Sequence, residues 1–196
     1  MPHSLRMRDT TGFVNPSAPP GKSQRYARPE RERRFLLAQW PTRAVERTTR
    51  IIDRYLVGTR LRLRQMIETQ GASQSTYYKL TQKVPAPDGG PGLLSTTYLN
   101  LKEYTLLATL PATMLCKTRY SIPPFGIDAY EGPLSGLILA EIEFDDDAAM
   151  NGFIPPAWTI AEVTLDSRFT GGSFITMQSE DLAGLLSAFG VHPVSR

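Results

Sequence analysis

The stretch RPERERRFLL, residues 28–37, has the residue composition of a strand but carries charge on both of its faces. Its two parities alternate as follows: Glu30, Glu32 and Arg34 on one side, and Arg31, Arg33 and Phe35 on the other. A half-buried strand normally turns hydrophobic side chains inward and charged ones outward. Neither face of this stretch is therefore ordinary core.

The same arrangement recurs in later segments, where charged residues share one parity and apolar residues share the other. These segments are RLRLR (60–64), YKLTQK (78–83), KTRY (117–120), AEIEF (140–144) and EVTLDSR (162–168). For any one strand, the simplest interpretation is the solvated face of an antiparallel sheet. For the whole set that interpretation weakens, because Arg, Lys and Glu dominate and Asn, Gln and Ser are nearly absent. A sheet that closes on itself would instead turn these faces into one polar lumen.

The order of expected elements is strands separated by turns, with a few helices. Strands are expected at 50–56, 60–66, 75–83, 93–99, 115–122, 125–131, 137–144 and 158–165, with a Pro/Gly loop at 84–92. Helices are expected at 41–48, after Pro41, at 101–110 and at 179–189. Asn100 and Glu103 have the spacing of a capping box at the start of the second helix.

Composition indicates one domain at 28–196, since 196 residues with 41% hydrophobic content suffice for one substantial core. Residues 1–27 are expected to be a flexible basic extension rather than a nucleic-acid arm, so no nucleic-acid partner is expected. The single cysteine, Cys116, excludes an intramolecular disulfide. No apolar run has the length of a membrane span or of a secretory signal, so we expect a cytoplasmic protein without a membrane partner.

The charged faces together contain more cations than carboxylates. The cations are Arg34, Arg60, Arg62, Arg64, Lys79, Lys83, Lys117, Arg119 and Arg168. The carboxylates are Glu30, Glu32, Glu141, Glu143, Glu162 and Asp166. Confined cations favour a polyanion such as a phosphate chain, and clustered carboxylates favour a hard divalent ion, Mg²⁺ or Mn²⁺. A metal-bound phosphate compound satisfies both.

Glu30, Glu32 and Arg34 resemble the ExExK motif of the CYTH superfamily, the triphosphate tunnel metalloenzymes, with Arg in place of the usual final Lys. The likeness continues in the order of the family through DRYLVGTRLRLR, YKLTQK, KTRYSI, GIDAYEGPLSGLILAEIEF and PPAWTIAEVTLDSRFTGG. The resemblance implies an α+β fold: a closed eight-stranded antiparallel β-barrel, or tunnel, with flanking helices. The face that carries Glu30 would then line the tunnel.

The resemblance also implies roles for individual residues in metal-assisted transfer of a phosphoryl group to water. The implied metal ligands are Glu30, Glu32, Asp128, Glu141, Glu143 and Glu162. The implied substrate-binding residues are Arg62, Arg64, Lys83, Lys117 and Arg168, with Arg60 a weaker candidate. The implied catalytic residues are Glu30, Glu32, Arg34, Lys79 and Arg119.

Several substrates are compatible with this resemblance. The leading expectation is hydrolysis of inorganic tripolyphosphate, because no aromatic or amide cluster is evident that would recognise a base. The alternatives are a nucleoside or thiamine triphosphatase, a class IV-type adenylyl cyclase and a non-catalytic polyphosphate-binding module. The His-Phe pair that typically precedes the motif in the cyclases is absent from GKSQRYARP, residues 21–29. The sequence leaves the oligomeric state open.

Overall fold

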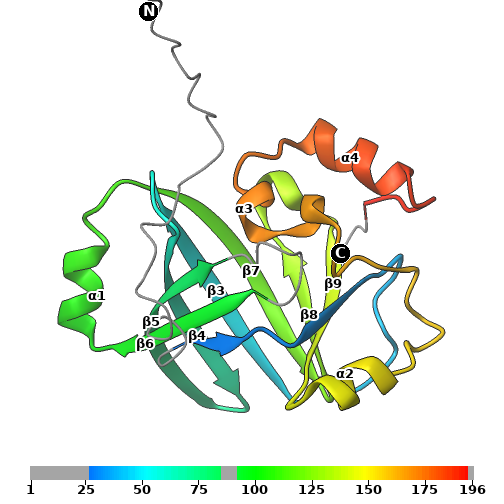
Figure 1. Ribbon diagram of the computed structural model, residues 1–196, viewed down its shortest axis with the longest axis horizontal. Coiled ribbons are helices and arrows are strands. Elements are labelled where there is room, and N and C mark those ends of the chain that lie inside the picture. Colours follow the sequence, from blue (N-terminus) through cyan, green and yellow to red (C-terminus); the bar gives the residue numbers. More distant parts are fainter. Residues whose placement is uncertain (1–26, 85–91, 194–196) are drawn as a thin grey trace, which may run out of the picture.

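The computed structural model describes residues 27–84 and 92–193, which form one antiparallel sheet and several short helices (Figure 1). The strands are β1 (Arg28–Pro29), β2 (Glu32–Leu36), β3 (Arg47–Leu56), β4 (Leu61–Gln70), β5 (Ser73–Val84), β6 (Leu93–Leu99), β7 (Ala112–Ile122), β8 (Phe125–Tyr130), β9 (Ile138–Glu143) and β10 (Ala161–Glu162). The α-helices are α1 (Leu101–Leu107), α2 (Asp147–Gly152), α3 (Gly171–Phe174) and α4 (Ser179–Ser187), and 3₁₀ turns lie at η1 (Gly132–Leu134) and η2 (Ser167–Phe169). None of the helices in the described part of the chain is long and apolar enough to cross a membrane.

The sheet has ten strands in the order β1-β6-β5-β4-β3-β7-β8-β9-β2-β10, with β1 and β10 at its edges. The prediction of an antiparallel α+β fold is confirmed, but the prediction of a closed eight-stranded barrel is wrong in both closure and strand number. The two additional strands, β1 and β10, contain two residues each. Both are edge segments too short to be recognised from a period-2 pattern.

The reason that the sheet does not close lies in residues 28–36. This stretch forms both β1, which pairs with β6, and β2, which pairs with β9. Between them, Glu30 donates its backbone N–H to the Gly92 carbonyl (2.9 Å), whereas the Arg31 carbonyl accepts from Phe144 (2.9 Å). β1 and β2 follow one another along the chain and run in the same line, so they cannot pair with each other. The β6 side and the β9 side of the sheet are therefore joined here by the peptide chain and not by a hydrogen-bonded ladder.

Local sequence determines several elements as expected. The hairpin of β3 and β4 turns at Gly58, whose φ of +71° lies in the left-handed region that favours glycine. Helix α1 begins with the predicted capping box, in which Asn100 Oδ1 accepts from Glu103 N (3.0 Å) and the Glu103 carboxylate accepts from Asn100 N (2.7 Å). Asp146 likewise caps α2, through a bond from Ala149 N (2.8 Å).

Two element predictions need correction. The helix expected at 41–48 is absent, and β3 begins at Arg47 because its first residues pair with both β4 and β7, including Arg47 with Ser121. These non-local ladders outweigh a weak helical signal. The strand expected at 158–165 is limited to Ala161–Glu162, since the chain after Val163 turns into η2. The Pro/Gly loop falls largely at 85–91, outside the described residues, as do residues 1–26.

Two apolar cores flank β2 on its opposite faces. Leu36 belongs to a core formed with Leu115, Leu139 and the C-terminal helices, including Phe174 and Leu186. The other core contains the aliphatic and aromatic residues of the alternate parity: Phe35, Leu37, Ile122, Phe125, Ile127, Ile138, Ala140 and Ile142, covered by Trp40, Tyr120, Phe144, Phe153 and Trp158. Because Glu32 and Arg34 share the parity of Leu36, the charged residues lie on the same sheet face as the first core.

Candidate active site

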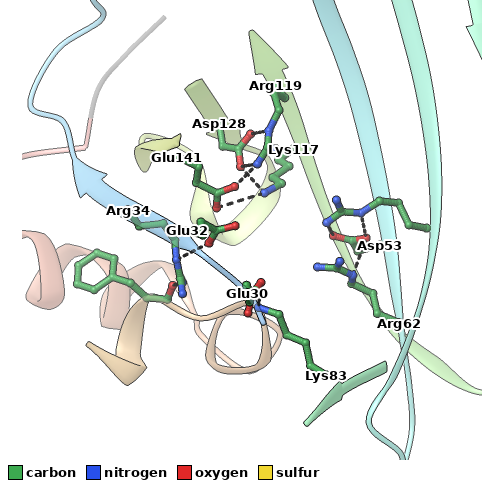
Figure 2. Close-up of polar contacts among 12 residues, drawn as sticks. Glu30, Glu32, Arg34, Asp53, Arg62, Lys83, Lys117, Arg119, Asp128 and Glu141 are labelled. Atoms are coloured by element: carbon green, nitrogen blue, oxygen red, sulfur yellow. Dashed lines mark hydrogen bonds and ion pairs between the residues drawn. The ribbon is translucent and has the colours of Figure 1, made fainter. Parts of the chain in front are cut away.

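The register of β2 and β9 places carboxylates and a guanidinium side by side. Glu32 lies opposite Glu143, and Arg34 lies opposite Glu141. Within β2, the Arg34 Nε is 2.9 Å from a Glu32 carboxylate oxygen, and the Arg34 guanidinium donates to the Phe169 carbonyl. Figure 2 shows Glu32, Arg34 and Glu141 facing one another. Predicted metal ligands and a predicted phosphate-binding residue therefore share one small region.

A network of buried charges connects β7, β8 and β9 (Figure 2). Arg119 forms a fork to Asp128, with Nε–Oδ1 and Nη2–Oδ2 distances of 2.7 Å. Lys117 also contacts Asp128, and its Nζ lies 3.9 Å from a Glu141 oxygen. Arg119 contacts Glu141 as well. Burial by itself would raise the pKa of the Glu141 carboxyl, but Lys117 and Arg119 outweigh burial and lower the pKa below its usual value.

The β3–β4 hairpin contributes a second group of buried charges. Asp53 accepts from Arg64 Nε and Nη2 at 2.6 and 2.7 Å, and Arg62 Nε lies 3.6 Å from Asp53 Oδ1. Burial opposes ionisation of Asp53, but the two arginines lower its pKa overall. Sequence reasoning missed Asp53, although a signal existed. A hairpin that turns at Gly58 places Asp53 directly opposite Arg64 in the register.

The Glu32 carboxyl lies in an environment that disfavours its charge. Its side chain is 16% exposed. Burial is the largest influence, and Glu141 and Glu30 add repulsion that Arg34 only partly offsets, so the pKa rises to about 7. Glu30 itself pairs with Lys83 at 2.7 Å, which brings a predicted phosphate-binding lysine next to a predicted metal ligand. Clustered carboxylates of this kind fit the binding of a cation.

Lys79 is a cation in cationic surroundings. It lies opposite Arg64 in the β4–β5 register and opposite Tyr98 in the β5–β6 register. Burial, followed by Arg64, Arg62 and Arg119, lowers its pKa to about 8, although Glu143 acts in the other direction. Within residues 27–84 and 92–193, no carboxylate comes within ion-pair distance of Lys79. This environment fits an anionic ligand.

Two predicted site residues are placed elsewhere. Glu162 forms a fork to Arg33, with distances of 2.9 and 2.6 Å, and Arg33 shares the parity of Phe35 rather than that of Glu32. Arg168 lies in η2, where it forms a fork to Asp166 with a side chain 55% exposed. Within the described residues, neither Glu162 nor Arg168 forms an ion pair with the buried charges described above.

The donor atoms fit a divalent metal in chemical type. The glutamates of the β1–β2 stretch and of β9 supply hard oxygen ligands: Glu30, Glu32, Glu141 and Glu143. Repulsion among them contributes to the raised pKa of Glu32, which a divalent cation would offset. Across the described residues, however, no three Asp, Glu, His or Cys side chains are gathered closely enough to hold an ion in this conformation.

A cavity of about 230 Å³ adjoins the charged network next to Arg119. It is lined by Arg47, Thr49, Arg119, Ser121, Pro123, Pro124, Phe125 and Gly126. Gly126 is needed for this arrangement, because a Cβ at that position would lie 2.9 Å from Arg119 Cδ. The guanidinium of Arg119 therefore borders both the carboxylates and an accessible space.

Comparison with known proteins identifies the relatives of this chain. No family model matches it. The inorganic triphosphatase of Nitrosomonas europaea is 34% identical over 154 residues, which cover 71% of this chain and 92% of that protein. A crystal structure of an inorganic triphosphatase matches with 26% identity, a TM-score of 0.48 and coverage of 74% of this chain and 93% of that one. A structure from Pyrococcus horikoshii matches with 14% identity, a TM-score of 0.43 and coverage of 84% and 93%. Since the Nitrosomonas enzyme aligns over nearly its whole length, the chain belongs to the family of that inorganic triphosphatase.

Proposed function

We propose that this protein hydrolyses inorganic tripolyphosphate to pyrophosphate and phosphate, as a member of the CYTH superfamily of triphosphate tunnel metalloenzymes. The observation that carries the proposal is the face shared by cations of β2, β4, β5 and β7 and carboxylates of β2 and β9. Its electrostatic coupling spans the site, since Glu141 is influenced by Arg34, Lys117, Arg119 and Arg64 from different strands. The relationship to an inorganic triphosphatase supports the same activity.

The cations of this face would bind and orient the phosphate chain. Arg forks and Lys ammonium groups bind phosphate oxygens and neutralise charge that develops on them during phosphoryl transfer. The residues proposed for this role are Arg34, Arg62, Arg64, Lys79, Lys83, Lys117 and Arg119. Lys79 and Arg62 are notable among them. Lys79 has no carboxylate partner among the described residues, and the buried Arg62 Nε makes no hydrogen bond there.

Mg²⁺ or Mn²⁺ would be held by Glu30, Glu32, Glu141 and Glu143. When bound, the ion supplies charge neutralisation of the phosphate chain and activation of water. The site favours a bound cation, because burial and repulsion by Glu141 make ionisation of Glu32 unfavourable in the absence of a cation. For Asp128 and Glu162 a metal-binding role stays a prediction, because their carboxylates are already engaged by Lys117 and Arg119 and by Arg33, respectively.

The proposal is tested by incubating the full chain with tripolyphosphate or ATP under identical Mg²⁺ or Mn²⁺ conditions and identifying the products. We expect tripolyphosphate to be cleaved with the higher kcat/KM and only in the presence of metal. Equal or better turnover of ATP would refute the substrate assignment. Cyclic AMP would identify a cyclase, and tripolyphosphate binding without turnover would identify a binding module.

Matched carboxylate variants separate the site from general effects of charge. Glu141→Gln removes a proposed ligand on the charged face and should abolish metal-supported turnover. Glu131→Gln removes a carboxylate that pairs with Arg50 at 3.1 Å, where the side chains of Arg50 and Glu131 are 53% and 38% exposed. This control should retain wild-type turnover. Equal rates for Glu141→Gln and the wild type would contradict the proposed site.

A further inference from the structure

Asp53 is a fully buried carboxylate between two proposed phosphate-binding arginines. It is 1% exposed, whereas Arg62 and Arg64 have side chains 19% and 8% exposed. Both oxygens of Asp53 face the Arg64 guanidinium, through Nε at 2.6 Å and Nη2 at 2.7 Å. Arg62 Nε lies 3.6 Å from one of the same oxygens. Figure 2 shows Asp53 beside Arg62 on the wall formed by β3 and β4.

The fork geometry fixes the orientation of Arg64 without using all of its hydrogen-bond donors. A guanidinium has five N–H donors in one plane, and Asp53 engages two of them. The plane of Arg64 is thereby set, and three N–H groups stay uncommitted to Asp53. Within the described residues, Arg64 forms no ion pair with any other carboxylate. These N–H groups are therefore suited to oxygens of a ligand.

Positioning is needed here because the surrounding charges push the arginines apart. Arg62 and Arg64 are at alternate positions of β4 and point to the same face, next to Lys79. Long cationic side chains in mutual repulsion would sample many rotamers, and ordering them on binding would lower affinity. Asp128 has the same relation to Lys117 and Arg119 on the other wall. The arrangement of one buried Asp between two cations thus occurs twice.

We propose that Asp53 is a positioning residue for phosphate recognition, which holds Arg62 and Arg64 in the orientation that binds the oxygens of a phosphate chain. This inference rests on the proposed function, since it takes the ligand to be a phosphate chain. Asp53 acts through the arginines and does not itself touch the substrate. Its oxygens are occupied by Arg64, so it is not a metal ligand.

A role as a simple counter-ion gives the opposite prediction. If Asp53 only neutralised positive charge, Asp53→Asn would make the face more cationic and tripolyphosphate would bind more tightly. If Asp53 positions the arginines, the same variant would weaken binding, because the Asn amide cannot accept both bonds from Arg64. The direction of the change therefore separates the two roles.

The experiment compares the wild type and Asp53→Asn, as full chains, in two measurements. Calorimetric titration with tripolyphosphate in the presence of a chelator gives Kd, and steady-state assays with Mg²⁺ give KM and kcat. We expect Kd and KM to rise about tenfold, as for the weakening of one charge-assisted hydrogen bond to a phosphate oxygen. The Mg²⁺ concentration for half-maximal turnover should stay unchanged, and so should all parameters of the Glu131→Gln control.

Two further outcomes keep the test decisive. Should Asp53→Asn fail to fold, Asp53→Glu retains the charge but displaces the arginines; a raised Kd and KM in that variant supports positioning, and wild-type values overturn it. Tighter binding by Asp53→Asn, or a shifted Mg²⁺ requirement, also overturns the proposal. Failure of the proposed function is recognised separately, because it would appear in the wild type as binding of tripolyphosphate without hydrolysis.

Discussion

Replacing Glu32 with Gln should stabilise the metal-free protein while removing its metal-supported activity. Gln has nearly the size of Glu and, like protonated Glu, carries no charge at any pH of interest. Glu32 ionises with a pKa of about 7 in the folded protein, compared with 4.5 in the unfolded chain, because of burial and repulsion by Glu141. The ionised carboxylate therefore opposes folding, and the variant removes that opposition.

The size and pH dependence of this effect follow from linkage. Between pH 4.5 and about 7, the folded protein retains a proton on Glu32 that the unfolded chain has released, so the free energy of unfolding of the wild type falls as pH rises. The difference between these pKa values corresponds to about 3 kcal/mol above pH 7. Attraction by Arg34 is already contained in the raised pKa. The lowered pKa of Glu141 acts below pH 4.5, outside this range.

Urea unfolding of both proteins, without metal, at about pH 4.5 and about pH 8.5 provides the measurement. We expect equal free energies of unfolding at the lower pH and an advantage of about 3 kcal/mol for Glu32→Gln at the higher pH. Saturating Mg²⁺ should reduce the difference, since the cation offsets the repulsion only in the wild type. A variant less stable than the wild type at pH 8.5 without metal would refute the reasoning.

Three further predictions concern the cations. Arg64→Ala should lower kcat/KM for tripolyphosphate about 100-fold, or about 3 kcal/mol, which is the usual effect of removing one preorganised hydrogen-bond donor. A kcat/KM within threefold of the wild type, measured by steady-state kinetics, would contradict the role of Arg64. The KM for tripolyphosphate should rise as pH increases through about 8, where Lys79 loses its proton. Lys79→Arg keeps its charge and should remove that rise when KM is measured over a pH series. The same dependence of KM on pH in this variant and in the wild type would exclude Lys79 as its source. Gly126→Ala should lower turnover, because the added Cβ would lie 2.9 Å from Arg119 Cδ, while thermal unfolding shows a folded protein; wild-type turnover would show that Arg119 can shift harmlessly.

The sequence predicted the strands of the site because their signal is local. Alternation of charged and apolar residues located β4, β5, β7 and β9, and Gly58 located the β3–β4 turn. The capping box at Asn100 predicted α1 for the same reason. Closure of the sheet was not predictable in this way, because it depends on how the halves of residues 28–36 pair with strands far away in sequence.

Partners of the charged residues were harder to predict than their faces. The parity of Glu162 suggested that it joins the other carboxylates, but β10 contains two residues, and its register places Glu162 opposite Phe35, on the side of Arg33. A strand that short has no periodic signal to determine its face. Asp53 was missed because it is the single acidic residue of β3 and shares its parity with Ile51 and Tyr55, so the strand shows no run of charges on that face. Its importance follows only from pairing with Arg64.

The double pairing of residues 28–36 also determines when the site can form. β2 docks on β9, more than 100 residues later in the chain, and β1 docks on β6. Contacts of such long sequence separation form late and slowly during folding. During synthesis, the charged side chains of residues 28–36 can therefore meet Glu141 and Glu143 only after β9 has been made. Residues 28–36 are thus synthesised well before the strands with which they pair, and the charged face is complete only after the chain has been synthesised past β9.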